Sequence, residues 1–350
     1  MSDGSEIPST ATTPGKPTLA DDALPPVEVP TMTFVTQLFL IPLLIVSIIV
    51  AVWLSVTWLV NVGSDPEKYV ADLENPGKGS WQSAASLADM LRNPRNDAMK
   101  RDASLCRKLS EALDKQIASG EMSDHAIKLR IFLCRTLGEF YRTDGLPVLI
   151  KAATTERDAK EVVVRRTAIE AIAVLADNTD PQRLLDEPDL LPALRNAALE
   201  RTDSSEDESV RGDLRARAAF TLGVLGGDEA LDVLDDVAGD GYPNARFNAA
   251  VGLARNGDER AIPVLVEMLD PENEDVTAGE EEETAIEWKR ALVMVNALES
   301  IERLAEINSD ADLSEVELAV RKLEDAELHN LIAGRIHTEA REVRQRLERR

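Results

Sequence analysis

Only a few residues in this sequence have the types and spacing that site chemistry requires. Asn308, Asp310 and Asp312 occupy the first, third and fifth positions of a possible calcium-binding loop between two helices. Such a loop also needs a glycine at its sharp turn and a closing glutamate, and Leu313 and Ala319 stand at those two positions. The spacing therefore excludes a calcium site of this type.

The same segment has the features of a helix start. Ser314 and Glu317 are three residues apart, which is the spacing of a capping box. In that motif each side chain accepts a hydrogen bond from a backbone N–H of the first turn, which would otherwise have no partner. We therefore predict that a helix begins at Ser314.

The cysteines and histidines do not form a reactive or metal-binding cluster in the sequence. Cys106 and Cys134 lie among leucines at helical spacing, which favours two small core residues over nucleophiles. His125, His329 and His337 have no Cys/His cluster around them. No phosphate-binding loop or paired-histidine helix motif appears either. We expect no cofactor, no metal and no enzymatic activity.

Composition narrows the fold class. The 350 residues are 44% hydrophobic and 29% charged, which is enough apolar material for substantial cores. The net charge of −25 excludes nucleic acid as a partner for most of the surface. Aromatic residues make up only 4%, which disfavours β-structure. We predict an all-α protein.

One segment is apolar enough to cross a membrane. Residues 38–60 are almost uninterrupted Leu, Ile, Val and Trp without any charge. As a helix they reach roughly 34 Å, and a hydrocarbon core is about 30 Å thick. A cleaved signal peptide would need a basic start and a shorter apolar run. We predict a transmembrane helix over residues 33–62 that remains as an uncleaved, single-pass anchor.

The segments on either side give the expected topology. Residues 1–32 are acidic and proline-rich with Lys16 as the single basic residue, so we predict a disordered tail. Residues 63–82 contain proline and glycine and are predicted to be a linker. Lys68 and Lys78 lie in this linker, and a surplus of cations favours the cytoplasmic side. We therefore expect the carboxyl-terminal part to be cytoplasmic.

Small side chains recur every four residues within the apolar segment. Ser47, Ala51 and Ser55 share one helix face, which would let a second helix approach closely. This is a candidate packing face for a homo-oligomer. Small residues are also common in membrane helices without any such role, so both interpretations stay open.

The remainder of the chain is repetitive. One pattern consists of an arginine, alanines three and four residues later, a leucine after seven and a glycine after eleven. Its clearest copies, 31 residues apart, are Arg215, Ala218, Ala219, Leu222 and Gly226, and Arg246, Ala249, Ala250, Leu253 and Gly257. Looser copies begin at Arg165 and Arg130. These offsets trace one stripe of a helix, and we predict that it packs against neighbouring helices.

A second short helix follows each copy, and three of the four carry a proline in the opening turn. The four segments are Leu146–Leu149, Leu191–Leu194, Leu231–Leu234 and Ile262–Leu265. Proline in a first turn lacks only an N–H that would have no helical partner, so it marks a helix start. Acidic inserts at Asp177–Pro188, Asp203–Ser209 and Asp270–Glu283 are predicted to be loops between helices.

These residues resemble the HEAT-like repeats of phycobilisome lyase subunits and of many bacterial scaffold proteins. The resemblance implies an alpha-solenoid, with first helices outside and second helices lining the concave side. We expect a HEAT-like alpha-solenoid of about five to six helix pairs over residues 83–328, with degenerate pairs at both ends. Residues 329–350 are predicted to form a capping helix, and the alternative is contact of its arginines with anionic lipid.

The predicted function is that of a membrane-anchored scaffold or adaptor that binds another protein. The alternative is a subunit of a membrane enzyme complex, including a lyase-like activity. Asp232, Asp235 and Asp236 share one face of a second helix and, with Glu267, form the candidate protein-binding face. A solvated acidic face is the simpler interpretation of these residues.

Overall fold

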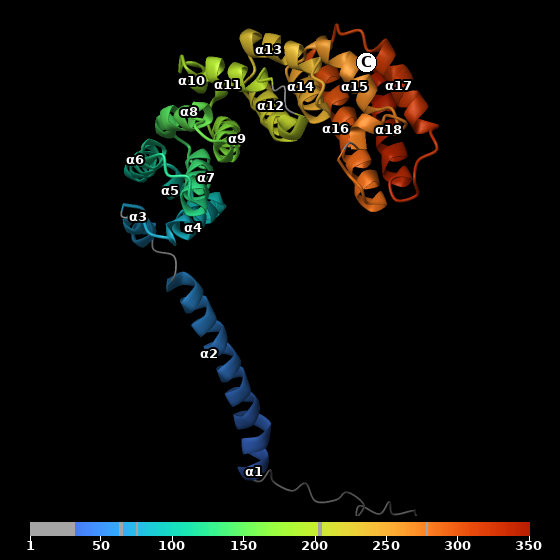
Figure 1. Ribbon diagram of the computed structural model, residues 1–350. Helices are drawn as coiled ribbons and strands as arrows, with labels where there is room; N and C mark the ends of the chain where they lie inside the picture. The colour runs from blue at the N-terminus through green and yellow to red at the C-terminus, as the bar shows by residue number, and fades with distance from the viewer. Residues whose placement is uncertain (1–31, 63–65, 75, 202–204, 278) are drawn as a thin grey trace, which may run out of the picture. The chain divides into compact units, whose positions relative to one another are not determined.

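The computed structural model describes residues 32–62, 66–74, 76–201, 205–277 and 279–350, which are helical or loop and contain no strand. The chain divides into two units, residues 1–64 and residues 65–350 (Figure 1). The tail predicted over residues 1–32 lies outside the described residues except for Met32.

The described part of the first unit is one continuous helical segment. It comprises α1 (Met32–Val35), a π-helical stretch η1 (Thr36–Leu40) and α2 (Ile41–Val62). The π-helical stretch ends next to Pro42, which has no N–H to continue the regular hydrogen-bond ladder. Residues 36–56 are long and apolar enough to cross a membrane, and none of them is buried.

The second unit is a series of helices joined by short loops. They are α3 (Pro66–Glu74), α4 (Ser80–Arg92), α5 (Asp97–Lys100), α6 (Ala103–Ser119), α7 (Asp124–Gly138), α8 (Leu146–Thr154), α9 (Val162–Asn178), α10 (Pro181–Leu185), α11 (Leu190–Ala198), α12 (Ser205–Leu225), α13 (Asp228–Ala238), α14 (Pro243–Arg255), α15 (Ile262–Met268), α16 (Glu283–Ile307), α17 (Ser314–Glu324) and α18 (Ala333–Leu347). Short 3-10 turns are η2 (Pro94–Asn96), η3 (Thr143–Gly145), η4 (Ala159–Glu161), η5 (Glu259–Ala261) and η6 (Glu274–Thr277).

These helices form two layers. The first helices of successive pairs, α4, α7, α9, α12, α14 and α16, pack on one another in chain order. The second helices, α6, α8, α11, α13, α15 and α17, form the other layer. This confirms the predicted alpha-solenoid. The segment 63–82, predicted to be a linker, contains α3, whose Val70 and Leu73 are buried against the stack.

The order of the two layers is opposite to the expectation. Within the second unit, the first helices lie on the inner side of the arc and the second helices on the outer side (Figure 1). The physical reason is the small side chains of the first helices. A Cβ atom built on Gly223 of α12 would lie 2.5 Å from the Cα atom of Gly252 on α14. Helices that approach this closely take the shorter, inner path of a curved stack.

The predicted packing stripe is confirmed for its alanines and leucines. Ala218, Ala219, Ala249 and Ala250 are completely buried in the core. The glycines eleven residues after the arginine have a different role. Gly226 and Gly257 lie beyond the helix ends with φ of 67° and 78°, a left-handed conformation that glycine adopts without strain. They terminate the first helices and do not belong to the packing face.

The arginine that opens each repeat is held by an acidic side chain. Arg215 is 1% exposed and forms two hydrogen bonds to Asp240, with Nε–Oδ2 at 2.9 Å and Nη2–Oδ1 at 3.0 Å. Asp240 lies in the loop between α13 and α14. This ion pair therefore joins the first helix of one repeat to the segment that leads into the next first helix.

The other three repeats contain the same connection, which we call the arginine clamp. Its members are Arg130 with Glu161 at 2.5 Å, Arg165 with Glu200 at 2.7 Å, Arg215 with Asp240, and Arg246 with Asp275 at 3.0 Å. In each case the acid precedes the next first helix in the chain. The predicted loop over Asp270–Glu283 thus supplies a clamp residue, Asp275.

The last helix seals the end of the stack. Ile332 and, on α18, Ile336, Val343 and Leu347 are buried against α16 and α17. Its arginines are largely engaged in ion pairs: Arg341 and Arg344 contact Glu324, and Arg346 contacts Glu302. This arrangement supports a capping helix, which remains our interpretation of residues 329–350.

The close approach of α12 and α14 yields a stability prediction. Gly223→Ala places a methyl group against the backbone of Gly252, and the helices must separate. We expect a loss of about 2 kcal/mol in the free energy of unfolding, measured by chemical denaturation. Gly241→Ala is the matched control, because nothing lies within 4 Å of its Cβ position, and should change stability by less than about 0.5 kcal/mol. Equal effects of the two substitutions would contradict the packing.

The clamp yields a second prediction. Asp240→Asn keeps the shape of the side chain and leaves the buried guanidinium of Arg215 without its full counter-charge. We expect destabilisation of about 3 kcal/mol, measured by denaturant unfolding. Arg201 also contacts Asp240 at 3.1 Å, but its side chain is 62% exposed. Arg201→Ala should therefore cost less than about 1 kcal/mol. A loss from Asp240→Asn as small as that of the control would show that the clamp contributes little.

Candidate protein-binding surface

Each first helix leaves one stripe of side chains uncovered on the inner side of the arc. Neighbouring first helices cover its flanks, and its second helix covers the outer side. Uncovered positions consequently recur at offsets of four and seven residues. The stripe comprises Asp213, Arg217, Phe220 and Val224 on α12, and Asn244, Asn248, Val251 and Arg255 on α14.

These stripes meet α16 around a hollow of about 270 Å³. We call it the inner groove; its polar lining includes Arg166, Asp213, Arg217, Asn248, Lys289 and Asn296. Leu292 of α16 also lines it and is 60% exposed. The inner groove thus combines cationic groups, side-chain amides and an open apolar side chain.

Most charges in the inner groove are already paired. Arg166 contacts Asp213 at 2.9 Å, and the Tyr242 hydroxyl donates a hydrogen bond to the same carboxylate at 2.8 Å. Burial and this bond raise the pKa of Tyr242. Lys289 lies 3.6 Å from Glu280. Arg217 differs, because no ion pair or hydrogen bond to its guanidinium is found among the described residues.

Large apolar side chains lie open beside the inner groove. Phe220 follows Arg217 by one helical turn and is 39% exposed. Trp288 precedes Leu292 by one turn of α16 and is 59% exposed. Exposed aromatic and aliphatic side chains next to polar groups are typical of protein-binding surfaces.

The predicted acidic face lies elsewhere, on the outer helix α13. Asp232 and Asp235 are exposed, and Arg260 contacts them at 3.1 Å and 3.4 Å. Asp236 is exposed on the same helix. Glu267 does not join this face, because it forms a two-pronged ion pair with Arg246. The structure therefore brings three of the four predicted residues together and assigns Glu267 to the repeat framework.

The predicted packing face of α2 is exposed along its length. The hydroxyl of Ser47 donates a hydrogen bond to the backbone carbonyl of Leu43 at 2.8 Å. The hydroxyl of Ser55 donates one to the carbonyl of Ala51 at 2.7 Å. These bonds satisfy both hydroxyls within the helix, so the face presents small side chains without unpaired donors. Self-association through Ser47, Ala51 and Ser55 stays a prediction.

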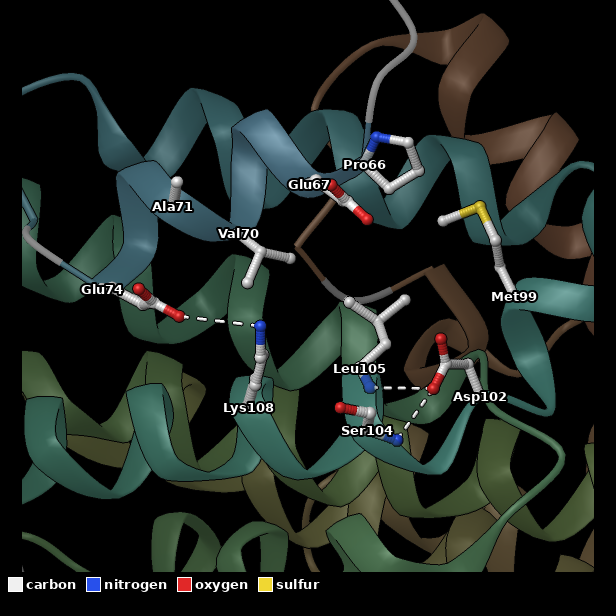
Figure 2. A pocket seen from close by; sticks show the side chains of 10 residues that line it. All are labelled: Pro66, Glu67, Val70, Ala71, Glu74, Met99, Asp102, Ser104, Leu105 and Lys108. Carbon is white, nitrogen blue, oxygen red and sulfur yellow. Dashed lines mark hydrogen bonds and ion pairs between the residues drawn. The ribbon is translucent and has the colours of Figure 1, made fainter.

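A larger cavity, of about 620 Å³, lies between α3 and α6 (Figure 2). Most of its polar groups are engaged in local structure. Asp102 accepts hydrogen bonds from the N–H groups of Ser104 and Leu105 and so caps α6. Glu74 contacts Lys108 at 3.8 Å. These contacts hold α3 on the stack and begin α6, so this cavity gives no sign of a specific ligand.

The cysteines are core residues, and the predicted capping box is wrong. Cys106 and Cys134 are completely buried, and burial raises the thiol pKa values to about 11 and about 12.

α17 begins at Ser314, as predicted, but Ser314 is the first helical residue and does not occupy the N-cap position. Its N–H and hydroxyl donate to Asp312, which lowers the pKa of that carboxyl, so the serine does not accept a bond as the cap.

The comparisons with known proteins agree with this architecture. Residues 198–284, which span α12, α13, α14 and α15, match the family of HEAT repeats. This segment is therefore similar to HEAT repeats. None of the curated proteins compared with the chain matches its sequence. The more specific resemblance to phycobilisome lyase subunits is not confirmed.

Seven chains of solved structures also match. One is human deoxyhypusine hydroxylase in complex with glycerol, with 17% identity and a TM-score of 0.29. The match covers 76% of this chain and 97% of the hydroxylase. The expectation that the chain is not an enzyme is contradicted by this match, because the matched protein is an enzyme by name. We withdraw that expectation.

The outer acidic face allows a direct test of its predicted role. Replacing Asp232, Asp235 and Asp236 by lysine removes the attraction for a basic partner patch and adds repulsion. We predict that a partner bound there no longer co-purifies with the chain. The control is Glu315→Lys on α17, which changes the charge of another exposed position. Co-purification unaffected by the triple substitution would leave α13 as a solvated face.

Proposed function

We propose that this chain is a HEAT-repeat scaffold that α2 holds in a membrane and that binds another protein through its solenoid. The observation that carries the binding part is the open apolar surface of the first helices. Phe220 of α12 and Trp288 and Leu292 of α16 remain exposed, and Trp288 and Leu292 are exposed to 59% and 60%. Other large apolar side chains of the solenoid that stay exposed are Val163, Val210, Ile307, Leu318 and Leu331. A partner surface would remove Phe220, Trp288 and Leu292 from water, which stabilises a complex by about 25 cal/mol per Å² of apolar area.

The membrane part rests on α2. Residues 36–56 are predominantly apolar, carry no charge and are not buried, so a large apolar surface would be exposed to water without a membrane. In a bilayer the helix satisfies its own backbone hydrogen bonds and places these side chains in hydrocarbon. We place the solenoid on the cytoplasmic side, because Lys68 and Lys78 follow the span and Lys16 alone precedes it.

Removal of the apolar segment tests the anchor. We expect the full-length chain to stay in the membrane pellet after carbonate extraction and a chain lacking residues 38–60 to be released, because no other described segment is able to span. Deletion of residues 1–31 is the control and should leave the protein in the pellet. Release of the intact chain by carbonate would contradict a spanning helix.

The partner's nature decides between scaffold and subunit. Purification of the intact chain in mild detergent should recover a protein partner that is lost when Trp288 and Leu292 are both replaced by serine. Several unrelated soluble partners would support the scaffold. One stoichiometric membrane enzyme would favour the subunit, and no partner under any detergent condition would contradict the proposed binding function.

A further inference from the structure

The inner groove has a charge character unlike that of the whole chain. The chain carries −25 overall, whereas the groove is lined by Arg166, Arg217 and Lys289 against Asp213 alone. Charged surfaces attract partners of opposite sign and repel those of like sign. Arg166 is paired with Asp213 and Lys289 with Glu280, so one cation, Arg217, remains in the groove without a counter-charge among the described residues. This surplus positive charge in an acidic protein is suited to receive an acidic ligand.

Arg217 is the cation of the inner groove whose guanidinium has no ion-pair partner among the described residues. Three arginines of the clamp, Arg130, Arg165 and Arg215, are buried, and all four are bonded to carboxylates, as Arg130 is to Glu161 and Arg215 to Asp240. Arg217 lies on the opposite side of α12 from Arg215, is half-buried, and has no such partner among the described residues. A guanidinium held in a groove matches a carboxylate with two parallel hydrogen bonds.

The remaining lining fits a polypeptide. Asn248 and Asn296 carry amides, which are able both to donate to and to accept from a peptide backbone. Leu292 lines the same groove, and Phe220 lies one turn from Arg217. A small inorganic anion would use the arginine and leave these apolar side chains uncovered. A peptide with an acidic residue next to apolar ones uses both kinds of group.

We propose that the inner groove binds an acidic, apolar segment of the partner protein, with an Asp or Glu carboxylate on Arg217 and an adjacent apolar side chain on Leu292. This inference rests on the proposed function, because it specifies the partner's chemistry at the same solenoid. It concerns the inner layer and is independent of the outer acidic face, which would select a basic patch.

The test selects ligands by their chemistry, so the partner itself need not be identified. The full-length chain, held in detergent micelles, is used to select from a library of random peptides displayed on phage. We expect the selected peptides to be enriched in Asp or Glu beside Leu, Phe or Trp. Fluorescence anisotropy of one selected peptide should then give an affinity at least about tenfold weaker for Arg217→Glu, since a charge-assisted bond becomes repulsion.

Two further variants keep the result interpretable. Arg195→Glu reverses an exposed charge on the outer helix α11 and should bind the peptide as the parent does. Arg217→Gln removes the charge without adding a new one and should lose most of the affinity. Both positions lie outside the core, so circular dichroism should show folded protein.

The opposite results would overturn the inference. Selected peptides without acidic residues, or equal binding by the parent and Arg217→Glu, would show that Arg217 does not receive a carboxylate. Loss of binding in the Arg195→Glu control would show a non-specific charge effect. If the chain still anchors in the membrane and still loses its partner with Trp288→Ser and Leu292→Ser, the proposed function survives the failure of this inference.

Discussion

The structure depends on an ion pair that recurs from one repeat to the next and is fully buried at Arg130–Glu161 and Arg215–Asp240. An arginine in the dry interior must be paired, because a lone buried charge costs several kcal/mol. In the clamp the counter-charge comes from the segment before the next first helix, as with Arg215 and Asp240. Formation of this ion pair therefore fixes the position of the following repeat. Repeat proteins are stabilised by contacts between neighbours, and here a directional, polar contact is added to apolar packing.

The clamp and the small-residue stripe together determine the inner surface. Glycine and alanine let the first helices approach, as at Gly223 and Gly252, and the clamp sets their order and spacing. The faces of the first helices that no neighbouring helix covers form the inner groove. One side of α12 thus carries Arg215 for the framework, and the other carries Arg217 for a ligand. The same residue type has two roles because burial and the available partner differ.

Much of this architecture is visible in the sequence, and the exceptions have physical causes. The apolar run of α2 and the alanine stripe at Ala218 and Ala249 depend on local periodicity, which a sequence displays directly. The clamp partners lie between 25 and 35 residues from Arg130, Arg165, Arg215 and Arg246 at varying spacing, so no fixed offset reveals them. The inner groove combines α9, α12, α14 and α16, and only the folded stack brings those helices together.

The central claim is that the clamp couples neighbouring repeats. Native-state amide hydrogen exchange of the Glu161→Gln variant, compared with the parent protein, tests this claim most directly. Glu161 is 1% exposed, and hydrogen bonds from Arg157 and Arg130 hold its pKa below the usual value despite burial. We predict faster amide exchange in both α7 and α9, because each loses the charge that ties it to the other. Faster exchange confined to the turn around residue 161, with both helices as protected as in the parent, would contradict coupling through the clamp.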